Sequence, residues 1–104
     1  MDVREKIAIW VDRGKQVGDV FSFHRNDLLY WSSVAIQKWD GVIKLYVDEI
    51  LESQMNAEKY EREEILEFDS VENALNYVSE NTMASLKKMM PCKGQKIFNP
   101  KFRS

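Results

Sequence analysis

Two side chains of this sequence, Cys92 and the single histidine His24, belong to types that often act as a nucleophile or a general base near neutral pH. The lysine that follows Cys92 favours a reactive thiolate. Neither side chain has a catalytic partner near it in the sequence, and no phosphate-binding or dinucleotide-binding fingerprint is present. A small enzyme that uses Cys92 or His24 is therefore one hypothesis, and a surface histidine with a small apolar cysteine is the simpler interpretation.

Carboxylates are the most concentrated chemical groups of the chain. Residues 48–80 carry eleven acidic side chains against two basic ones, whereas residues 81–104 carry six basic side chains and no acidic one. A glycosidase pair needs a sugar-binding cleft, which a small meander of strands rarely forms. The alternating Asp, Asn and Gly pattern of a calcium loop is missing, and one cysteine with one histidine does not complete a structural zinc site. We therefore expect no catalytic residue, no metal and no cofactor.

This acidic concentration has two interpretations. A run of charge is usually a solvated surface, but self-repulsion of this size is also relieved by a basic partner. For a partner-binding site we select the central part of the run, with one tyrosine as an aromatic anchor. The selected residues, called the acidic set below, are Asp48, Glu49, Glu52, Glu58, Tyr60, Glu61, Glu63 and Glu64.

The basic end of the chain supports an alternative function. Cations interleaved with phenylalanines can grip a nucleic-acid strand through phosphate contacts and base stacking. The residues concerned are Lys87, Lys88, Lys93, Lys96, Lys101 and Arg103, with Phe98 and Phe102. A nucleic-acid-associated regulator is therefore the second hypothesis, although a pI near 5.4 is far from that of basic nucleic-acid-binding domains. The same cations are equally able to fold back on the acidic set.

The elements that position these groups begin with a helix. A chain of 104 residues forms one domain, residues 1–104, and is large enough to bury a core without a disulfide. Apolar residues at positions 3, 7, 10 and 11 recur at helical spacing, and Asp2 with Glu5 has the form of a capping box. The pattern predicts a helix over residues 3–13, with a strand over the same residues as the alternative, and Gly14 as its end.

The strongest structural signal is Asp40-Gly41 between two apolar runs, which predicts a β-hairpin of strands 28–39 and 42–51. An earlier turn is predicted around residues 25–27, after a strand over residues 20–23. In the strand 42–51, apolar residues alternate with Lys44, Tyr46 and Asp48. This alternation predicts a sheet with one buried face and one wet face.

Shorter patterns define the remaining elements. Residues 53–62 are predicted to form a loop and residues 63–68 a strand, followed by a helix that Asp69 caps and Asn81 ends in the left-handed conformation. A short helix through residue 90 precedes an extended basic tail over residues 91–104. The predicted fold class is α+β, with a meander of four or five antiparallel strands, helices on one face and the order α-β-β-β-β-α.

Three stretches of the chain look like those of bacterial immunity proteins, in particular those of contact-dependent growth-inhibition systems. The stretches are residues 39–47 (WDGVIKLYV), 68–75 (FDSVENAL) and 93–100 (KGQKIFNP). The resemblance implies a protein that neutralises a cognate toxin, often a nuclease, by binding over or beside its active site. It implies a monomer in a 1:1 complex with a basic toxin domain, without contact to nucleic acid or membrane.

A nuclease must hold phosphates with cations, so the acidic set is its natural counter-charge, and a ribonuclease is the expected target. The cytoplasm is the expected location. The sequence has no apolar run of the roughly 20 residues that span a bilayer, and its start lacks the pattern of a secretion signal.

Overall fold

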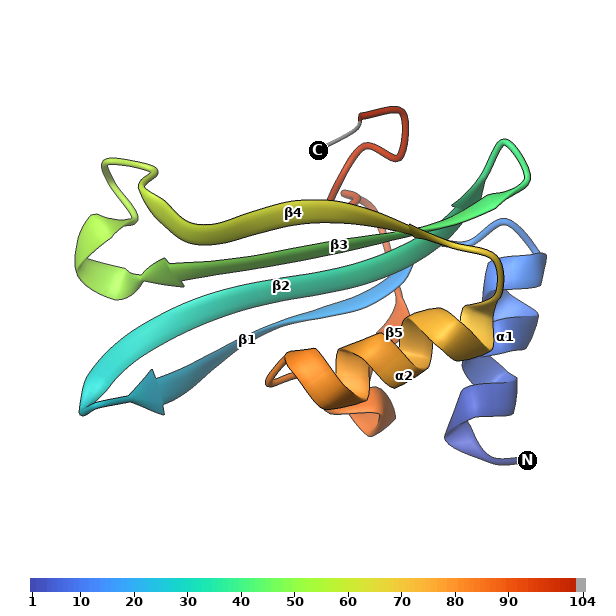
Figure 1. Ribbon diagram of the computed structural model, residues 1–104, viewed down its shortest axis with the longest axis horizontal. Helices are drawn as coiled ribbons and strands as arrows, with labels where there is room; N and C mark the ends of the chain where they lie inside the picture. The colour runs from blue at the N-terminus through green and yellow to red at the C-terminus, as the bar shows by residue number, and fades with distance from the viewer. Residues whose placement is uncertain (103–104) are drawn as a thin grey trace.

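The computed structural model describes residues 1–102, which form two α-helices and a five-stranded antiparallel sheet (Figure 1). The strand order in the sheet is β4-β3-β2-β1-β5. The predicted α+β class and the order of the main elements are confirmed, and the fifth strand is a two-residue pairing with β1. In chain order the elements are α1 (Val3–Asp12), β1 (Val17–Arg25), β2 (Leu28–Trp39), β3 (Val42–Leu51), the 3₁₀ helix η1 (Glu52–Gln54), β4 (Tyr60–Phe68), α2 (Val71–Asn81), the 3₁₀ helix η2 (Leu86–Lys88) and β5 (Met90–Pro91).

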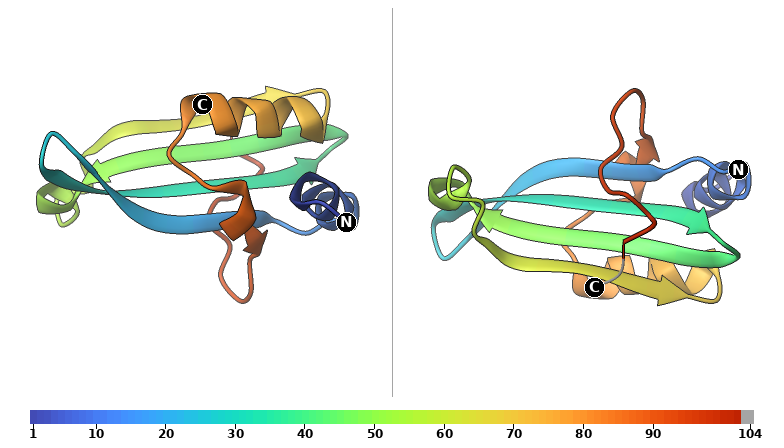
Figure 2. Two further views of the ribbon diagram at one scale, coloured as in Figure 1. Left: turned by 90° about the horizontal axis from the view of Figure 1, so that it is seen from below. Right: turned by 90° about the horizontal axis from the view of Figure 1, so that it is seen from above.

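The sheet lies between the two helices on one face and the C-terminal segment on the other (Figure 2). We call these the helix face and the second face. The helices cover the half of the sheet near the β2–β3 turn, and the other half projects beyond them (Figure 1). Alternate residues of the central strands and one side of each helix form the core. Its fully buried members include Ile7, Val11, Val34, Ile36, Leu45, Val47, Ala74, Leu75 and Val78.

Local signals in the sequence explain the boundaries of α1 and of the two hairpins. Asp2 caps α1 by accepting a 2.8 Å hydrogen bond from the backbone of Glu5, and Gly14 follows the helix with φ +85°. The turns Asn26-Asp27 and Asp40-Gly41 both have positive φ at their two central residues, which is the backbone of a two-residue hairpin. The predicted helix and the hairpin of β2 and β3 are therefore confirmed.

Four local predictions are wrong or shifted. Strand β4 begins at Tyr60, inside the predicted loop, because its residues pair with β3 around an irregular register at Glu49 and Ile50. Strand β1 starts earlier than predicted, at Val17.

The cap of α2 is Ser70, whose hydroxyl accepts a 3.1 Å bond from the backbone of Asn73. Helix α2 ends at Asn81, and Thr82 caps it in extended backbone, whereas a left-handed Asn81 was predicted.

The second face is not the wet face that alternation predicted. Lys44, Tyr46 and Asp48 are all buried on the sheet, and the end of the C-terminal segment crosses that face after a loop that projects beyond β1 (Figure 2). A free, extended tail is accordingly not confirmed within the described residues, since Phe98 is buried. Arg103, counted among the basic residues above, lies outside the described residues.

One buried amide fastens this C-terminal segment. Gln16, 3% exposed, donates from Nε2 to the carbonyl of Phe98 at 2.9 Å and to Gln37 Oε1 at 2.8 Å. Its Oε1 accepts the backbone N–H of Ile97 at 2.7 Å and that of Phe98 at 3.3 Å. The backbone carbonyl of Gln16 also accepts the N–H of Cys92 at 2.8 Å. The segment is therefore held by specific hydrogen bonds as well as by apolar contact.

Candidate functional site

The acidic set divides between the two faces of the sheet. Successive residues of a strand point to opposite faces, so Glu49 lies on the helix face and Asp48 on the second face. On β4, Glu64 reaches Tyr77 of α2, whereas Glu63 reaches Tyr46 on the second face. The remaining acids lie where β3 gives way to β4: Glu52 in η1, Glu58 in the following turn and Glu61 at the start of β4.

On the helix face, arginines neutralise the acidic charge. Glu49, 5% exposed, lies 3.2 Å from Arg25 Nη1 and 3.7 Å from Arg62 Nη1. Arg62 also lies 2.7 Å from Glu64 and donates to the carbonyl of Asn81 in α2. Although burial opposes it, bonds from Arg62 and the Tyr77 hydroxyl hold the pKa of Glu64 below its ordinary value. Glu49 and Glu64 therefore help to join β3 and β4 to α2. Because arginines of the same chain already pair with both carboxylates, their charges are not available to a partner.

On the second face, one tyrosine lies between two carboxyl groups. The Tyr46 hydroxyl is 2.8 Å from Asp48 Oδ2 and 2.8 Å from Glu63 Oε2, and Asp48 Oδ1 accepts the N–H of Ser33 at 2.7 Å. A phenol has one proton to donate, so two good contacts require a second proton. Burial raises the pKa of Asp48 above its ordinary value. A second proton shared between the two carboxyl groups satisfies every contact of the Tyr46 hydroxyl.

This arrangement predicts that Asp48→Asn is more stable than the native protein at neutral pH, by about 1 kcal/mol. A raised carboxyl pKa contributes stability that is complete below the ordinary value of 3.8 and is lost as pH rises through the folded-state pKa. Asparagine keeps a neutral donor at every pH, so its advantage grows from pH 4 to pH 8. Urea unfolding at several pH values measures it, with exposed Asp12→Asn as the control. A variant less stable than the native protein across that range would contradict the assignment.

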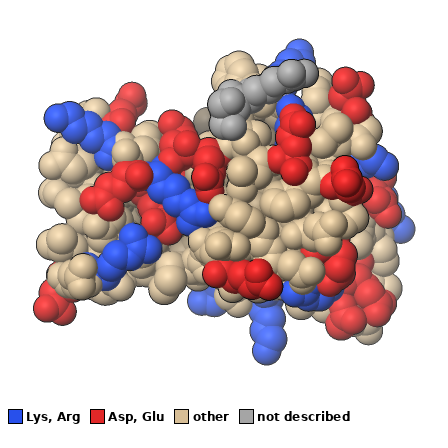
Figure 3. Space-filling model, in the orientation of Figure 1, with Lys and Arg blue, Asp and Glu red and all other residues tan. Residues whose placement is uncertain are grey.

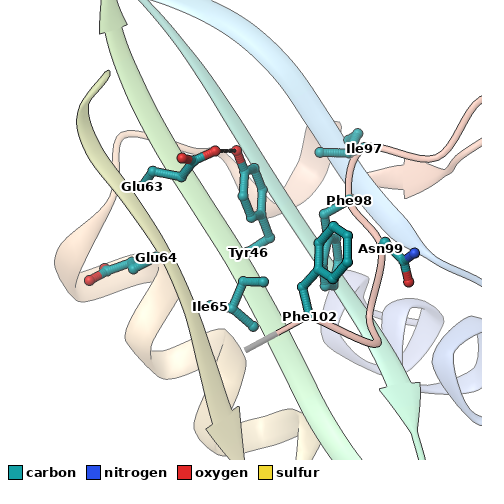
Figure 4. Close-up of a pocket in the computed structure, with 8 residues that line it drawn as sticks. All are labelled: Tyr46, Glu63, Glu64, Ile65, Ile97, Phe98, Asn99 and Phe102. Atoms are coloured by element: carbon teal, nitrogen blue, oxygen red, sulfur yellow. Dashed lines mark hydrogen bonds between the residues drawn. The ribbon is translucent and has the colours of Figure 1, made fainter. Parts of the chain in front are cut away.

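Beside this tyrosine the second face contains a pocket of about 480 Å³ between β3, β4 and the C-terminal segment (Figure 4). The rings of Tyr46 and Phe98 stack with centroids 5.5 Å apart. Glu63 turns toward Tyr46, whereas Glu64 points away (Figure 4). The pocket is therefore mainly apolar, with one exposed carboxylate at its rim. Its lining consists of Tyr46, Glu63, Glu64, Ile65, Ile97, Phe98, Asn99 and Phe102.

Sequence reasoning missed this pocket. It selected Glu63 and Glu64 for their charge but not Tyr46, nor the Ile97-Phe98 pair that closes the pocket. The available signal was that apolar pair within an otherwise polar, basic stretch. Such a pair is costly to leave in water and is more often buried.

The exposed carboxylates of the acidic set gather around the start of β4, at the projecting end of the sheet. They are Glu52, Glu58, Glu61 and Glu63, and Tyr60 among them is 42% exposed. Lys59 is the one exposed cation in the described stretch 48–64, since Arg62 is half-buried. Figure 3 views the molecule from the side of β4 and α2, where acidic side chains spread widely and basic ones lie among them in the left half. We call Glu52, Glu58, Tyr60, Glu61 and Glu63 the acidic edge.

No known relative decides what this surface binds. No protein-family model matches the chain, and neither a curated protein nor a solved structure shows significant similarity to it.

The two candidate enzymatic side chains lie at opposite ends of β1. His24 is exposed beside the Asn26-Asp27 turn, whereas Cys92 follows β5 next to Gln16. Burial raises the pKa of the Cys92 thiol, against smaller opposing effects of the Ile97 backbone N–H and of Lys96, so the net direction is opposite to the activation expected from nearby lysines. Among the described residues no group of three or more His, Cys, Asp and Glu is arranged to hold a metal ion.

The basic end does not present the aromatic platform that nucleic-acid binding would use. Phe98 is buried against Tyr46, and Lys101 lies over the Trp39 ring, 5.8 Å from its centroid. Phe102 is exposed. Within residues 1–102, none of the ion pairs joins a lysine of residues 87–101 to the acidic set.

No helix in this described part is long and apolar enough to cross a bilayer.

Proposed function

We propose that this protein is an inhibitor that binds a basic protein partner through the acidic edge and the adjoining pocket. The observation that carries the proposal is the concentration of exposed carboxylates around an exposed tyrosine at the start of an edge strand. Exposed charge of one sign accelerates the encounter with an oppositely charged protein and disfavours other partners. An exposed aromatic residue at its centre supplies the apolar contact area that such interfaces need.

The pocket indicates how a partner's side chain is received. A lysine or arginine has an apolar stem and a charged head. The stem fits against Ile65 and Phe98, while the head meets the Glu63 carboxylate at the rim. We expect one basic side chain of the partner to occupy this position.

The partner class that fits best is a nuclease toxin domain, and within it a ribonuclease, with this chain as the immunity protein that covers the active site. Nuclease sites hold phosphates with cations, and such cations are complementary to the acidic edge. This assignment agrees with the resemblance of three stretches of the sequence to immunity proteins. It also places the protein in the cytoplasm, where the RNA substrate of such a toxin is found.

Co-expression tests this function directly. If a large secreted protein is encoded immediately upstream, its C-terminal domain is produced in a bacterial host, alone or together with this chain, and growth and RNA integrity are measured. We expect the domain alone to arrest growth and degrade RNA, and the pair to do neither. Continued RNA degradation in the presence of a stable, well-expressed chain would rule out the immunity function.

A triple variant, Glu52→Gln/Glu58→Gln/Glu61→Gln, tests the surface. Each substitution removes a charge and leaves an amide oxygen in the place of a carboxylate oxygen, so the side chain at position 61 can still accept the 3.1 Å bond from Tyr30. We expect association with the toxin domain to slow about tenfold at low salt and the difference to vanish at high salt. Stopped-flow fluorescence measures the rate.

The matched control is Glu5→Gln/Asp12→Asn/Glu80→Gln, which removes three exposed charges on the two helices. It should associate at the native rate. If both triple variants slow association equally, net charge and not the acidic edge controls the encounter.

A further inference from the structure

The two edges of the sheet differ in how they are protected. The β4 edge carries several charged side chains, and its pairing with β3 is irregular at Glu49 and Ile50. Both features discourage another strand from pairing with it. On the other edge, β5 pairs only with Val17 and Gly18, so β1 has no second partner strand from Asp19 to Arg25 within the described residues. Figure 2 shows no strand on the outer side of this part of β1, opposite to β2.

This open part of β1 is well suited to pairing. It keeps an uninterrupted register with β2 and contains no proline, no lysine and no bulge. Its centre, Val20-Phe21-Ser22-Phe23, is uncharged, and Val20 is 55% exposed. An exposed edge of this kind is a template for another strand.

The direction of the backbone groups fixes which residues can pair. In a two-residue hairpin, the residues that flank the turn exchange hydrogen bonds, here Arg25 and Leu28. Alternate residues of β1 therefore bond to β2, and the residues between them, Val20, Ser22 and His24, direct N–H and C=O outward. The Gln16 carbonyl, of the same parity, accepts the N–H of Cys92 on this outer side.

We propose that β1 pairs with β1 of a second copy of this chain, antiparallel and centred on Ser22, to form a two-fold dimer with one continuous sheet. In this register Ser22 exchanges backbone bonds with its counterpart, and Val20 exchanges them with His24 of the other copy. Asp19 of one copy lies opposite Arg25 of the other, an ion pair that occurs twice. A two-fold interface must be self-complementary in this way.

Other registers fit less well. Shifting the pairing toward Val17 would require Gly18, whose outward groups already serve β5. Shifting it toward the turn would separate Asp19 from Arg25 and shorten the paired stretch. The Ser22 register uses the whole open edge and also sets Phe21 opposite Phe23, and aromatic cross-strand pairs stabilise sheets. The β4 edge stays free, so the dimer presents two acidic edges in place of the single site of a 1:1 complex.

Sedimentation velocity over a concentration series tests the dimer. We expect a species of twice the 12.3 kDa chain mass that Ser22→Pro converts to monomer. Proline removes an outward N–H and none of the bonds to β2. Loss of the two symmetric bonds should raise the dimer dissociation constant roughly tenfold or more. Ser22→Ala keeps the backbone donor and should remain dimeric. A native chain that sediments as a monomer throughout would overturn the proposal, as would a Ser22→Pro dimer of native affinity.

Disulfide trapping tests the register and does not depend on the folding of the proline variant. In a Cys92→Ser background, Ser22→Cys should form an intermolecular disulfide under mild oxidation, because opposite residues of a strand pair are about 5.5 Å apart at Cα. Val20→Cys alone should not form an intermolecular disulfide, because Val20 is not opposite its own counterpart. A mixture of Val20→Cys and His24→Cys chains should form one. Equal cross-linking of Val20→Cys and Ser22→Cys would show that the proposed register is wrong.

Discussion

Replacing Gln16 with methionine is expected to detach residues 97–102 from the sheet and to lower the free energy of unfolding by about 3 kcal/mol. The Gln16 amide makes hydrogen bonds to Gln37 and to the backbone of Ile97 and Phe98. Methionine has a similar length but offers none of them. It therefore leaves buried donors and acceptors without partners, which costs more than the loss of exposed bonds.

Urea unfolding measures the stability, and hydrogen exchange of the Ile97 amide reports detachment. The expected exchange is close to that of an unprotected amide. The control is Gln95→Met, an exposed glutamine of the same segment, which should leave both observables unchanged. If the Ile97 amide stays protected in Gln16→Met, apolar packing of Phe98 and not the amide holds the segment.

Gly18→Ala is expected to destabilise the protein by about 3 to 5 kcal/mol, because atoms of β2 occupy the space that a Cβ on this residue would need. A Cβ at this position would lie 2.8 Å from the Ala35 Cβ and would overlap the carbonyl oxygen of Val34. The backbone of β2 is fixed by pairing on both sides, with β1 and β3. It cannot move away without breaking one of the two ladders.

Thermal unfolding of the variant, with Ser22→Ala on the same strand as the control, measures this cost. The double variant Gly18→Ala/Ala35→Gly should recover part of the loss, because it removes the overlap with the Ala35 Cβ. Full stability of Gly18→Ala would mean that β1 and β2 are farther apart than described here.

The elements that sequence reasoning placed correctly are those that local chemistry determines. The β2–β3 hairpin depends on two turn residues that tolerate positive φ, and α1 depends on a cap and a terminal glycine. The misplaced cap of α2 is a local error as well, since Asp69 and Ser70 are both good caps and only backbone geometry selects Ser70.

The candidate site was predicted less well, because its environment comes from residues distant in sequence. Tyr46 and Asp48 alternate with core residues, as in a half-wet sheet, yet Phe98, more than fifty positions later, stacks on Tyr46. Likewise, Glu49 and Glu64 belong to the acidic run by composition, but Arg62 and Arg25 neutralise them in the fold. Strand alternation alone places Glu49 and Glu64 on the face opposite to Asp48 and Glu63, so that division was predictable from the sequence.

The Gln16 contact also bears on the order of folding. Gln16 leaves the ribosome long before Ile97 and Phe98 are synthesised, so its amide stays without those partners while β1 to β4 are already made. Local hairpins form quickly, whereas contacts between residues this distant along the chain form late. The second face with Tyr46 is therefore expected to be open to solvent, and to chaperones, until the C-terminal segment closes over it. The few hydrogen bonds that stabilise the native protein are therefore also the ones that close its second face at the end of synthesis.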